Sequence, residues 1–155
     1  MTSQVKNSPQ ADLSVSASAS PRSVLLVDNF EPWRRLVCSR LEANEQLRVV
    51  GEAADGLEAV QKAHKLKPDL VLLDISLPNL NGFETARRIT QLVPEAKILF
   101  VTQTNDADVV KAALSNGARG YLLKADAGSE LLPAIETVLR GEKFVSADLL
   151  NRVLD

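Results

Sequence analysis

Short apolar runs alternate with longer helical segments along most of this sequence, and that alternation limits the folds open to the chain. The segments between the runs have apolar residues at helical spacing, so each run is followed by a predicted helix. Five strand-then-helix units predict a parallel sheet with helices on both faces, because parallel strands need long crossover connections. The third, fourth and fifth runs are almost continuously apolar, as strands covered on both faces are. The five runs occupy residues 24–27, 47–53, 70–73, 97–101 and 120–123.

The first helical segment directly follows the run at residues 24–27. Pro32 suits the first turn of this helix, where a backbone amide hydrogen would have no helical partner. Apolar residues then recur at helical spacing and predict a stripe that faces the core and has a basic edge. The stripe consists of Trp33, Leu36, Val37, Arg40 and Leu41.

Stop signals mark the ends of two later helices. The fourth helix is expected to begin near Asn105 or Asp106 and to end at Asn116, which a glycine follows. The fifth is expected to end at Arg140, again before a glycine. Pro133 must fall in the first turn of this fifth helix or weaken it.

The ends of the chain differ from its middle. Residues 1–22 are rich in Ser and Pro and poor in large apolar residues, which predicts a flexible N-terminal tail. Residues 23–146 carry the alternating pattern and are expected to form one domain. Residues 147–155 are expected to be a short C-terminal tail or the start of a linker.

Composition excludes several kinds of function. The chain has a net charge of −2, no apolar run of membrane-spanning length and no secretory signal pattern, so we expect a soluble cytoplasmic protein without a net-charge case for nucleic-acid binding. Cys38 is the single cysteine and is expected to be a small buried side chain. His64 is the single histidine, so a His/Cys metal site is excluded. Carboxylate chemistry remains.

Four of the predicted strands end in reactive side chains. These are Asp28, Asp74, Thr102 and Lys124. Each of these four residues, taken alone, has an ordinary structural interpretation. Together they indicate a site, because the carboxyl ends of parallel strands lie at one edge of the sheet, where such sheets bind ligands. The two carboxylates suit Mg²⁺, and Asp74 could act as a nucleophile that forms an aspartyl-phosphate. Thr102 and Lys124 could then stabilise the phosphoryl oxygens.

Residues 23–146 resemble the receiver domain of two-component response regulators, the CheY-like superfamily. The matching text is VLLVDN at 24–29, DLVLLDISLPNLNG at 69–82, ILFVTQT at 98–104 and GYLLK at 120–124. The resemblance implies a flavodoxin-like (βα)5 fold, a doubly wound five-stranded parallel sheet of order 2-1-3-4-5 between two helical layers. The text GARGYLLK and LRGEKFVS looks most like receivers of the LuxR/NarL/FixJ type, but the segment after Ser146 is too short for their DNA-binding domain.

The resemblance also assigns a metal site. It implies that Asp74 is the phosphoacceptor and that Asp28 belongs to an acidic pocket that binds Mg²⁺ or Mn²⁺. The backbone carbonyl of Ser76 would be a further metal ligand. The family usually has a second acidic residue where this chain has Asn29, so we expect weaker metal binding.

The switch residues implied by the resemblance are Thr102, Lys124 and Tyr121, the last being the aromatic side chain that turns inward on activation. The resemblance implies a signalling domain rather than an enzyme, with only self-directed phosphotransfer and autodephosphorylation. Its partners would be a histidine kinase and a downstream protein that binds the surface of helix 4, strand 5 and helix 5. A homodimer is also compatible with it, whereas direct nucleic-acid or membrane binding is not expected.

Two departures from the family pattern leave the function open. Asn29 permits an alternative function, a receiver-like interaction module that no longer depends on phosphorylation. Gln103 stands where a small residue is common and is expected to restrict access to the phosphoryl site. A dehalogenase-like phosphatase is disfavoured because strand three offers Asp74-Ile75-Ser76 without a second Asp, and an FMN protein because no phosphate-binding loop follows strand one.

Overall fold

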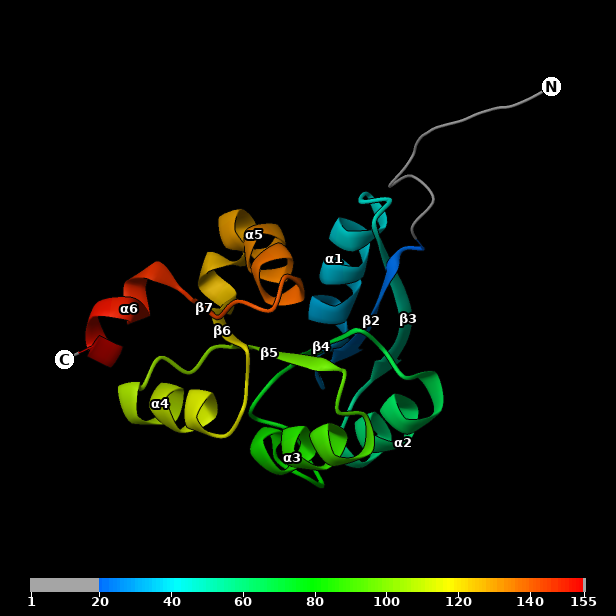
Figure 1. The fold of residues 1–155 in the computed structure, drawn as a ribbon, viewed down its shortest axis with the longest axis horizontal. Coiled ribbons are helices and arrows are strands. Elements are labelled where there is room, and N and C mark those ends of the chain that lie inside the picture. Colours follow the sequence, from blue (N-terminus) through cyan, green and yellow to red (C-terminus); the bar gives the residue numbers. More distant parts are fainter. Residues whose placement is uncertain (1–19, 155) are drawn as a thin grey trace.

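A single parallel sheet of six strands forms the middle of the molecule in the computed structural model, which describes residues 20–154 (Figure 1). The strand order is β3-β2-β4-β5-β6-β7, and the first five strands reproduce the predicted order 2-1-3-4-5. The flavodoxin-like fold class is therefore confirmed, with one short strand added at an edge. The strands are β2 (Arg22–Val27), β3 (Leu47–Ala53), β4 (Leu70–Leu73), β5 (Lys97–Thr102), β6 (Gly120–Leu123) and β7 (Phe144–Val145).

Helices cover both faces of the sheet. In Figure 1, α1 and α5 lie on one side and α2, α3 and α4 on the other. A short 3-10 turn, η2 (Lys124–Asp126), joins β6 to α5. The helices are α1 (Glu31–Glu42), α2 (Gly56–Leu66), α3 (Gly82–Leu92), α4 (Ala107–Ser115), α5 (Ala127–Leu139) and α6 (Ala147–Leu154).

The sheet separates two apolar clusters, because successive strand residues point to opposite faces. On β2, Leu25 and Val27 join the cluster beneath α2, α3 and α4, whereas Val24 and Leu26 join the cluster beneath α1 and α5. All four residues of β4 are buried. The nearly continuous apolar runs of the sequence thus mark strands covered on both faces, as predicted.

The predicted stripe on α1 is wrong at Leu36, whose side chain is 53% exposed. The buried residues of α1 are Val37 and Leu41, four residues apart. At about 100° of rotation per residue, Leu36 lies well to one side of that line, so it faces solvent. Pro32 lies in the first turn of α1, as expected.

Pro133 lies in the interior of α5 rather than in its first turn. The helix nevertheless continues to Leu139, and the ring of Pro133 is exposed to solvent. Helix α4 begins and ends close to the predicted residues, with Asp106 as its N-cap and Asn116 as its C-cap.

The segment predicted to be a C-terminal tail or the start of a linker, residues 147–155, contains helix α6, which follows β7 and Ser146. β7 pairs with β6, and Ser146 follows it with a fully buried side chain. The Ser146 amide donates to the Tyr121 carbonyl at 3.0 Å, and the Leu123 amide donates to Ser146 Oγ at 2.9 Å. Helix α6 then places Leu149, which has no exposed surface, in the cluster on the α4 side.

The N-terminal tail expected over residues 1–22 falls outside the described residues as far as residue 19, and Arg22 already belongs to β2. The division into a tail, one domain and a C-terminal segment therefore stays a prediction. Within residues 20–154, no helix combines the length and apolar character needed to cross a membrane.

Candidate functional site

The register of the central strands brings Asp28 and Asp74 to one edge of the sheet. Val27 of β2 pairs with Leu73 of β4, so each aspartate is the next residue along its strand. The Asp74 amide donates to the Val27 carbonyl at 3.1 Å, which continues the pairing for one more residue. Both aspartates are buried, with 3% and 7% of their surface exposed. Two carboxylates from separate strands therefore share one site, as predicted.

Gly82 packs the loop that follows Asp74 closely against the Asp74 backbone. The Gly82 amide donates to the Ile75 carbonyl at 2.8 Å. A Cβ atom on Gly82 would lie 2.5 Å from the Asp74 carbonyl oxygen and 2.5 Å from Ile75 Cα. Only glycine permits this approach. Gly82, at the end of the DISLPNLNG segment, therefore packs directly against the backbone of Asp74.

Lys124 supplies the positive charge of the site. Its Nζ lies 2.6 Å from Asp28 Oδ2 and 3.5 Å from Asp74 Oδ2, and the lysine side chain is only 12% exposed. One ammonium thus faces two carboxylates. When both are ionised, the cluster retains an excess negative charge that could attract a cation.

Asp28 is the more constrained of the two carboxylates. Its Oδ1 accepts a hydrogen bond from the Phe30 amide at 2.8 Å. Its Oδ2 is buried and receives no hydrogen bond of good geometry from the described residues, although the Lys124 ammonium lies beside it. Burial raises the pKa of Asp28, and the contact with Lys124 opposes that rise.

An open pocket at this edge collects most of the predicted site residues. Its lining includes one residue that the sequence did not single out, Phe30, which is 61% exposed at the mouth. No motif in the sequence marks Phe30 as a site residue, because a single exposed aromatic residue has no characteristic pattern. The lining residues are Asp28, Asn29, Phe30, Asp74, Ser76, Gln103 and Lys124.

The pocket offers oxygen donors of the kind that Mg²⁺ prefers. They are the carboxylates of Asp28 and Asp74, the amide of Asn29 and the backbone of Ser76. Across residues 20–154, no three His, Cys, Asp or Glu side chains gather at a possible metal site. A Mg²⁺ ion here would have two protein carboxylates and would retain several water ligands.

Thr102 and Tyr121 lie behind the pocket and not on its surface. Thr102 pairs with Leu123, the residue before Lys124, and is buried. The Thr104 amide donates to Thr102 Oγ1 at 3.5 Å, while the Tyr121 hydroxyl donates to the Thr104 carbonyl at 2.7 Å. The Tyr121 side chain thus faces inward, and its burial raises the pKa of the phenol. Thr104 contacts both expected switch residues.

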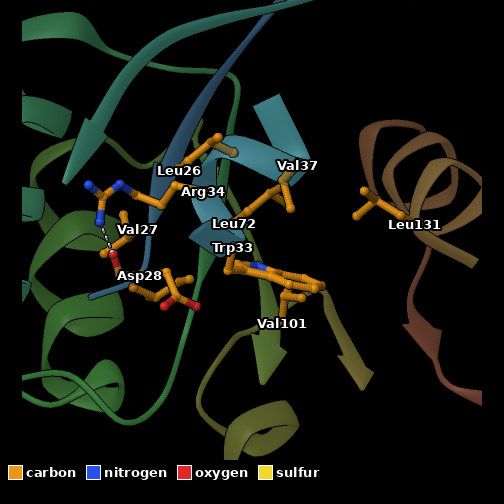
Figure 2. A pocket seen from close by; sticks show the side chains of 10 residues that line it. Leu26, Val27, Asp28, Trp33, Arg34, Val37, Leu72, Val101 and Leu131 are labelled. Carbon is orange, nitrogen blue, oxygen red and sulfur yellow. Dashed lines mark hydrogen bonds between the residues drawn. The ribbon is translucent and has the colours of Figure 1, made fainter. Parts of the chain in front are cut away.

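Helix α1 approaches the site with Trp33 and Arg34. Figure 2 shows the Trp33 ring beside the Asp28 carboxylate, with the side chain of Val101 next to the ring, all lining one small cavity. Lys124 Nζ lies 5.1 Å from the centroid of the Trp33 ring. Trp33 thus lies near the acidic pair.

Arg34 is mostly buried beside the site. Its side chain is 16% exposed, pairs with Glu52 at 2.9 Å and donates from Nη1 to the Asp28 carbonyl at 2.6 Å (dashed in Figure 2). The neighbouring Arg35 is exposed. Cys38 departs from expectation, because it is only partly buried and its Sγ lies 3.6 Å from a Glu42 carboxylate oxygen.

Comparison with known proteins agrees with this geometry. Residues 24–136 match the family model described as "Response regulator receiver domain". The chain is 35% identical to response regulator protein VraR of Staphylococcus epidermidis over 84% of its own length and 62% of that protein. It is 35% identical to the transcriptional regulatory protein LnrK of Bacillus subtilis, over 85% of this chain and 60% of that protein. The chain thus spans about three fifths of these curated relatives.

Solved structures show the same fold. A two-component response regulator of the LuxR family from Aurantimonas sp. SI85-9A1 superposes with a TM-score of 0.83 at 32% identity, covering 87% of this chain and 96% of that one. The response regulator domain of Thermotoga maritima CheB superposes with a TM-score of 0.73 at 31% identity, covering 77% of this chain and 97% of that one.

Proposed function

The chain belongs to the response regulator receiver domain family, and on that premise we propose that it accepts a phosphoryl group on Asp74 and thereby changes the surface it offers to other proteins. One observation carries this proposal. The Asp74 carboxylate lines an open pocket while Lys124 Nζ lies 3.5 Å from it and the second carboxylate, Asp28, contacts the same ammonium.

The proposed donor is a phosphohistidine of a partner histidine kinase, since receivers of this family act with such kinases. An oxygen of Asp74 forms a bond to phosphorus as the P–N bond of the donor breaks, and the histidine nitrogen keeps the electron pair and takes up a proton. The product is an aspartyl-phosphate. The chain would catalyse only this self-directed transfer and the later hydrolysis, so its output is binding.

Positioned positive charge is what such a transfer needs, because negative charge spreads over the phosphoryl oxygens. Lys124 is held at the site by two carboxylates and would follow the phosphoryl group as a point charge. Thr102, at the end of β5, would donate its hydroxyl to the same oxygens once the group is in place.

Receivers of this family generally bind Mg²⁺, and Asp28, Asn29, Asp74 and Ser76 would hold it here, with Mn²⁺ as a substitute. The metal would offset the repulsion between the incoming phosphoryl group and the carboxylates. Two hydrogen bonds support this role for Asp28: Arg34 donates to its backbone carbonyl, and the Phe30 amide donates to its Oδ1.

The response to phosphorylation would pass through Thr104, which contacts both Thr102 and Tyr121. If Thr102 turns toward the phosphoryl group, the loop that accepts the Tyr121 hydrogen bond must adjust. The expected output surface is formed by α4, β6 and α5. Because β7 pairs along the outer edge of β6, that surface would also include β7 and α6.

Incubation with Mg²⁺ and phosphoramidate, followed by intact-mass measurement, tests the proposal. We expect the mass of one phosphoryl group on the wild-type chain and none on Asp74→Asn. Asp108→Asn, an exposed aspartate on α4, is the matched control and should label like the wild type. Acetyl phosphate provides a second small donor.

A phosphorylation-independent interaction module is the second candidate, and the exposed Asn29 at the pocket favours it. The site has two carboxylates where family members usually have three. Failure of wild-type labelling with both small donors and with a partner kinase would overturn the phosphoacceptor proposal in favour of this module. Equal labelling of Asp74→Asn would assign the phosphoryl group to another residue.

A further inference from the structure

We propose that Trp33 is a positioning residue for Lys124, whose ammonium its indole ring holds against the two carboxylates of the site. This inference rests on the proposed function, because it concerns the residue that would follow the phosphoryl group. It adds a role for an α1 side chain that contributes neither a metal ligand nor a phosphoryl contact.

The first observation is the geometry of the contact. Lys124 Nζ lies 5.1 Å from the centroid of the Trp33 ring, within the 6 Å at which a cation is attracted by an aromatic ring. Tryptophan is the strongest partner for such a contact. The lysine side chain is only 12% exposed, and a desolvated cation–π contact is stronger than an exposed one.

The second observation is that packing and hydrogen bonding of α1 fix the position of the Trp33 ring. Trp33 packs in the apolar cluster beneath α1 and α5, and its amide donates to the Phe30 carbonyl at 3.1 Å. The neighbouring Arg34 fastens the same turn of α1 to Asp28 and Glu52. Lys124, by contrast, carries its charge on a flexible four-carbon stem, which would otherwise sample many rotamers.

The third observation is the position of the Trp33 ring relative to the two carboxylates. In Figure 2 the Trp33 ring lies beside the Asp28 carboxylate, with the side chain of Val101 next to the ring. Asp28 and Asp74 attract the ammonium electrostatically at 2.6 and 3.5 Å. The indole ring adds an attraction that depends on neither carboxylate. When a phosphoryl group or a metal changes the charge at Asp28 and Asp74, the ring would still keep Lys124 at the site.

The main test is a double-mutant cycle that combines Trp33→Leu and Lys124→Met, read as the initial rate of phosphorylation by phosphoramidate with Mg²⁺. We expect Trp33→Leu to slow phosphorylation by about three- to tenfold, the range that a partly desolvated cation–π contact supplies. Trp33→Phe keeps a ring and should lose about twofold or less. Leu36→Ala, exposed on the same helix, should match the wild type.

The Lys124→Met background separates positioning from packing. If Trp33 acts through Lys124, Trp33→Leu causes no further loss of rate once the ammonium is absent. If Trp33 only supports the fold, the same fractional loss appears in both backgrounds, and the inference is overturned. Circular dichroism and thermal unfolding would establish that each variant is folded at the assay temperature.

Fluorescence tests the contact without any phosphoryl transfer. Trp33 is the only tryptophan of the chain, so the emission of the protein reports on this ring alone. We expect Lys124→Met to change the emission intensity and maximum of the phosphodonor-free protein. Lys111→Met, at an exposed position on α4, should leave both unchanged.

The two readouts distinguish the two proposals. If the wild type is not phosphorylated but Lys124→Met changes the emission, the proposed function fails while the contact between Trp33 and Lys124 stands. If the emission of Lys124→Met equals that of the wild type, the ring and the ammonium do not interact in solution, and the inference fails whatever the phosphorylation result.

Discussion

Lys124 is the residue at which the charges of the candidate site meet. It contacts Asp28 and Asp74 and lies over Trp33, so contacts from β2, β4 and α1 converge on one ammonium. With both carboxylates ionised, the three charged groups leave one negative charge uncompensated. Burial raises the pKa of Asp28, while the contact with Lys124 opposes that rise.

Asn29 determines how strongly that excess charge attracts a metal. Restoring a carboxylate with Asn29→Asp should tighten Mg²⁺ binding, since two unit charges 4 Å apart at an effective dielectric constant of 20 interact by at most about 4 kcal/mol. After desolvation, an improvement of about tenfold in affinity is a reasonable expectation. The affinity is measured by titrating Mg²⁺ against Trp33 fluorescence.

Gln61→Glu adds the same charge on the exposed face of α2 and serves as the control. It should change the affinity little. Equal affinities of the wild type and Asn29→Asp would contradict the argument that the missing charge weakens the site.

Gln103 is exposed at the pocket and follows the buried Thr102. If its side chain shields the acceptor from attacking water, Gln103→Ala should shorten the lifetime of the phosphorylated chain, by about two- to fivefold for one lost steric barrier. The decay of the phosphorylated mass over time measures this. Gln91→Ala, exposed at the end of α3, is the matched control, and an unchanged or longer lifetime in Gln103→Ala would discard the shielding role.

The convergence of Asp28, Asp74 and Lys124 could be predicted because each directly follows a strand of a parallel sheet, so topology alone brings them to one edge. Arg34 could not be placed in the same way. Its partners are Glu52 on another strand and a backbone carbonyl, and a carbonyl has no signature in a sequence.

At the scale of elements, the main addition to the predicted fold is β7 with α6. β7 has only two residues, and alternation cannot be detected over so short a length. Helix α6 has eight residues and lies at the end of the chain, where a tail was the simpler expectation. The buried Ser146 between them accepts a hydrogen bond from the Leu123 amide of β6. A serine in a sequence does not indicate such a role, because most serines are exposed and have no fixed partner.

The packing of α6 can be tested with Leu149→Ala. Leu149 has no exposed surface, so the change should lower the free energy of unfolding by about 2–4 kcal/mol, as large-to-small changes in a core do. Chemical denaturation monitored by circular dichroism measures this. Leu150→Ala alters a side chain that is 45% exposed and should cost about 1 kcal/mol or less; equal effects of the two variants would show that α6 is not docked in solution.

At the scale of the whole molecule, the sequence pattern predicted the layers of the fold, because five strand-then-helix units require crossover helices on both faces of a parallel sheet. The structure has an apolar cluster on each face of the sheet. The strand order came from the family resemblance and not from periodicity, because an apolar run does not indicate which other strand it pairs with. The close approach of Gly82 to the Asp74 backbone places the first residue of α3 against the end of β4, a contact that a sequence pattern does not predict.

The hydrogen bonds of Ser146 have a dynamic consequence. They join the main chain of β6 at Tyr121 and Leu123 to the first turn of α6, where Leu149 and Leu150 donate to the Ser146 carbonyl. The C-terminal helix and the strand that precedes Lys124 therefore cannot open separately without leaving buried polar groups unpaired. In native-state amide exchange, α6 and β6 would therefore behave as a single cooperative unit. Local opening of α6 would then also disorder the strand that positions Lys124.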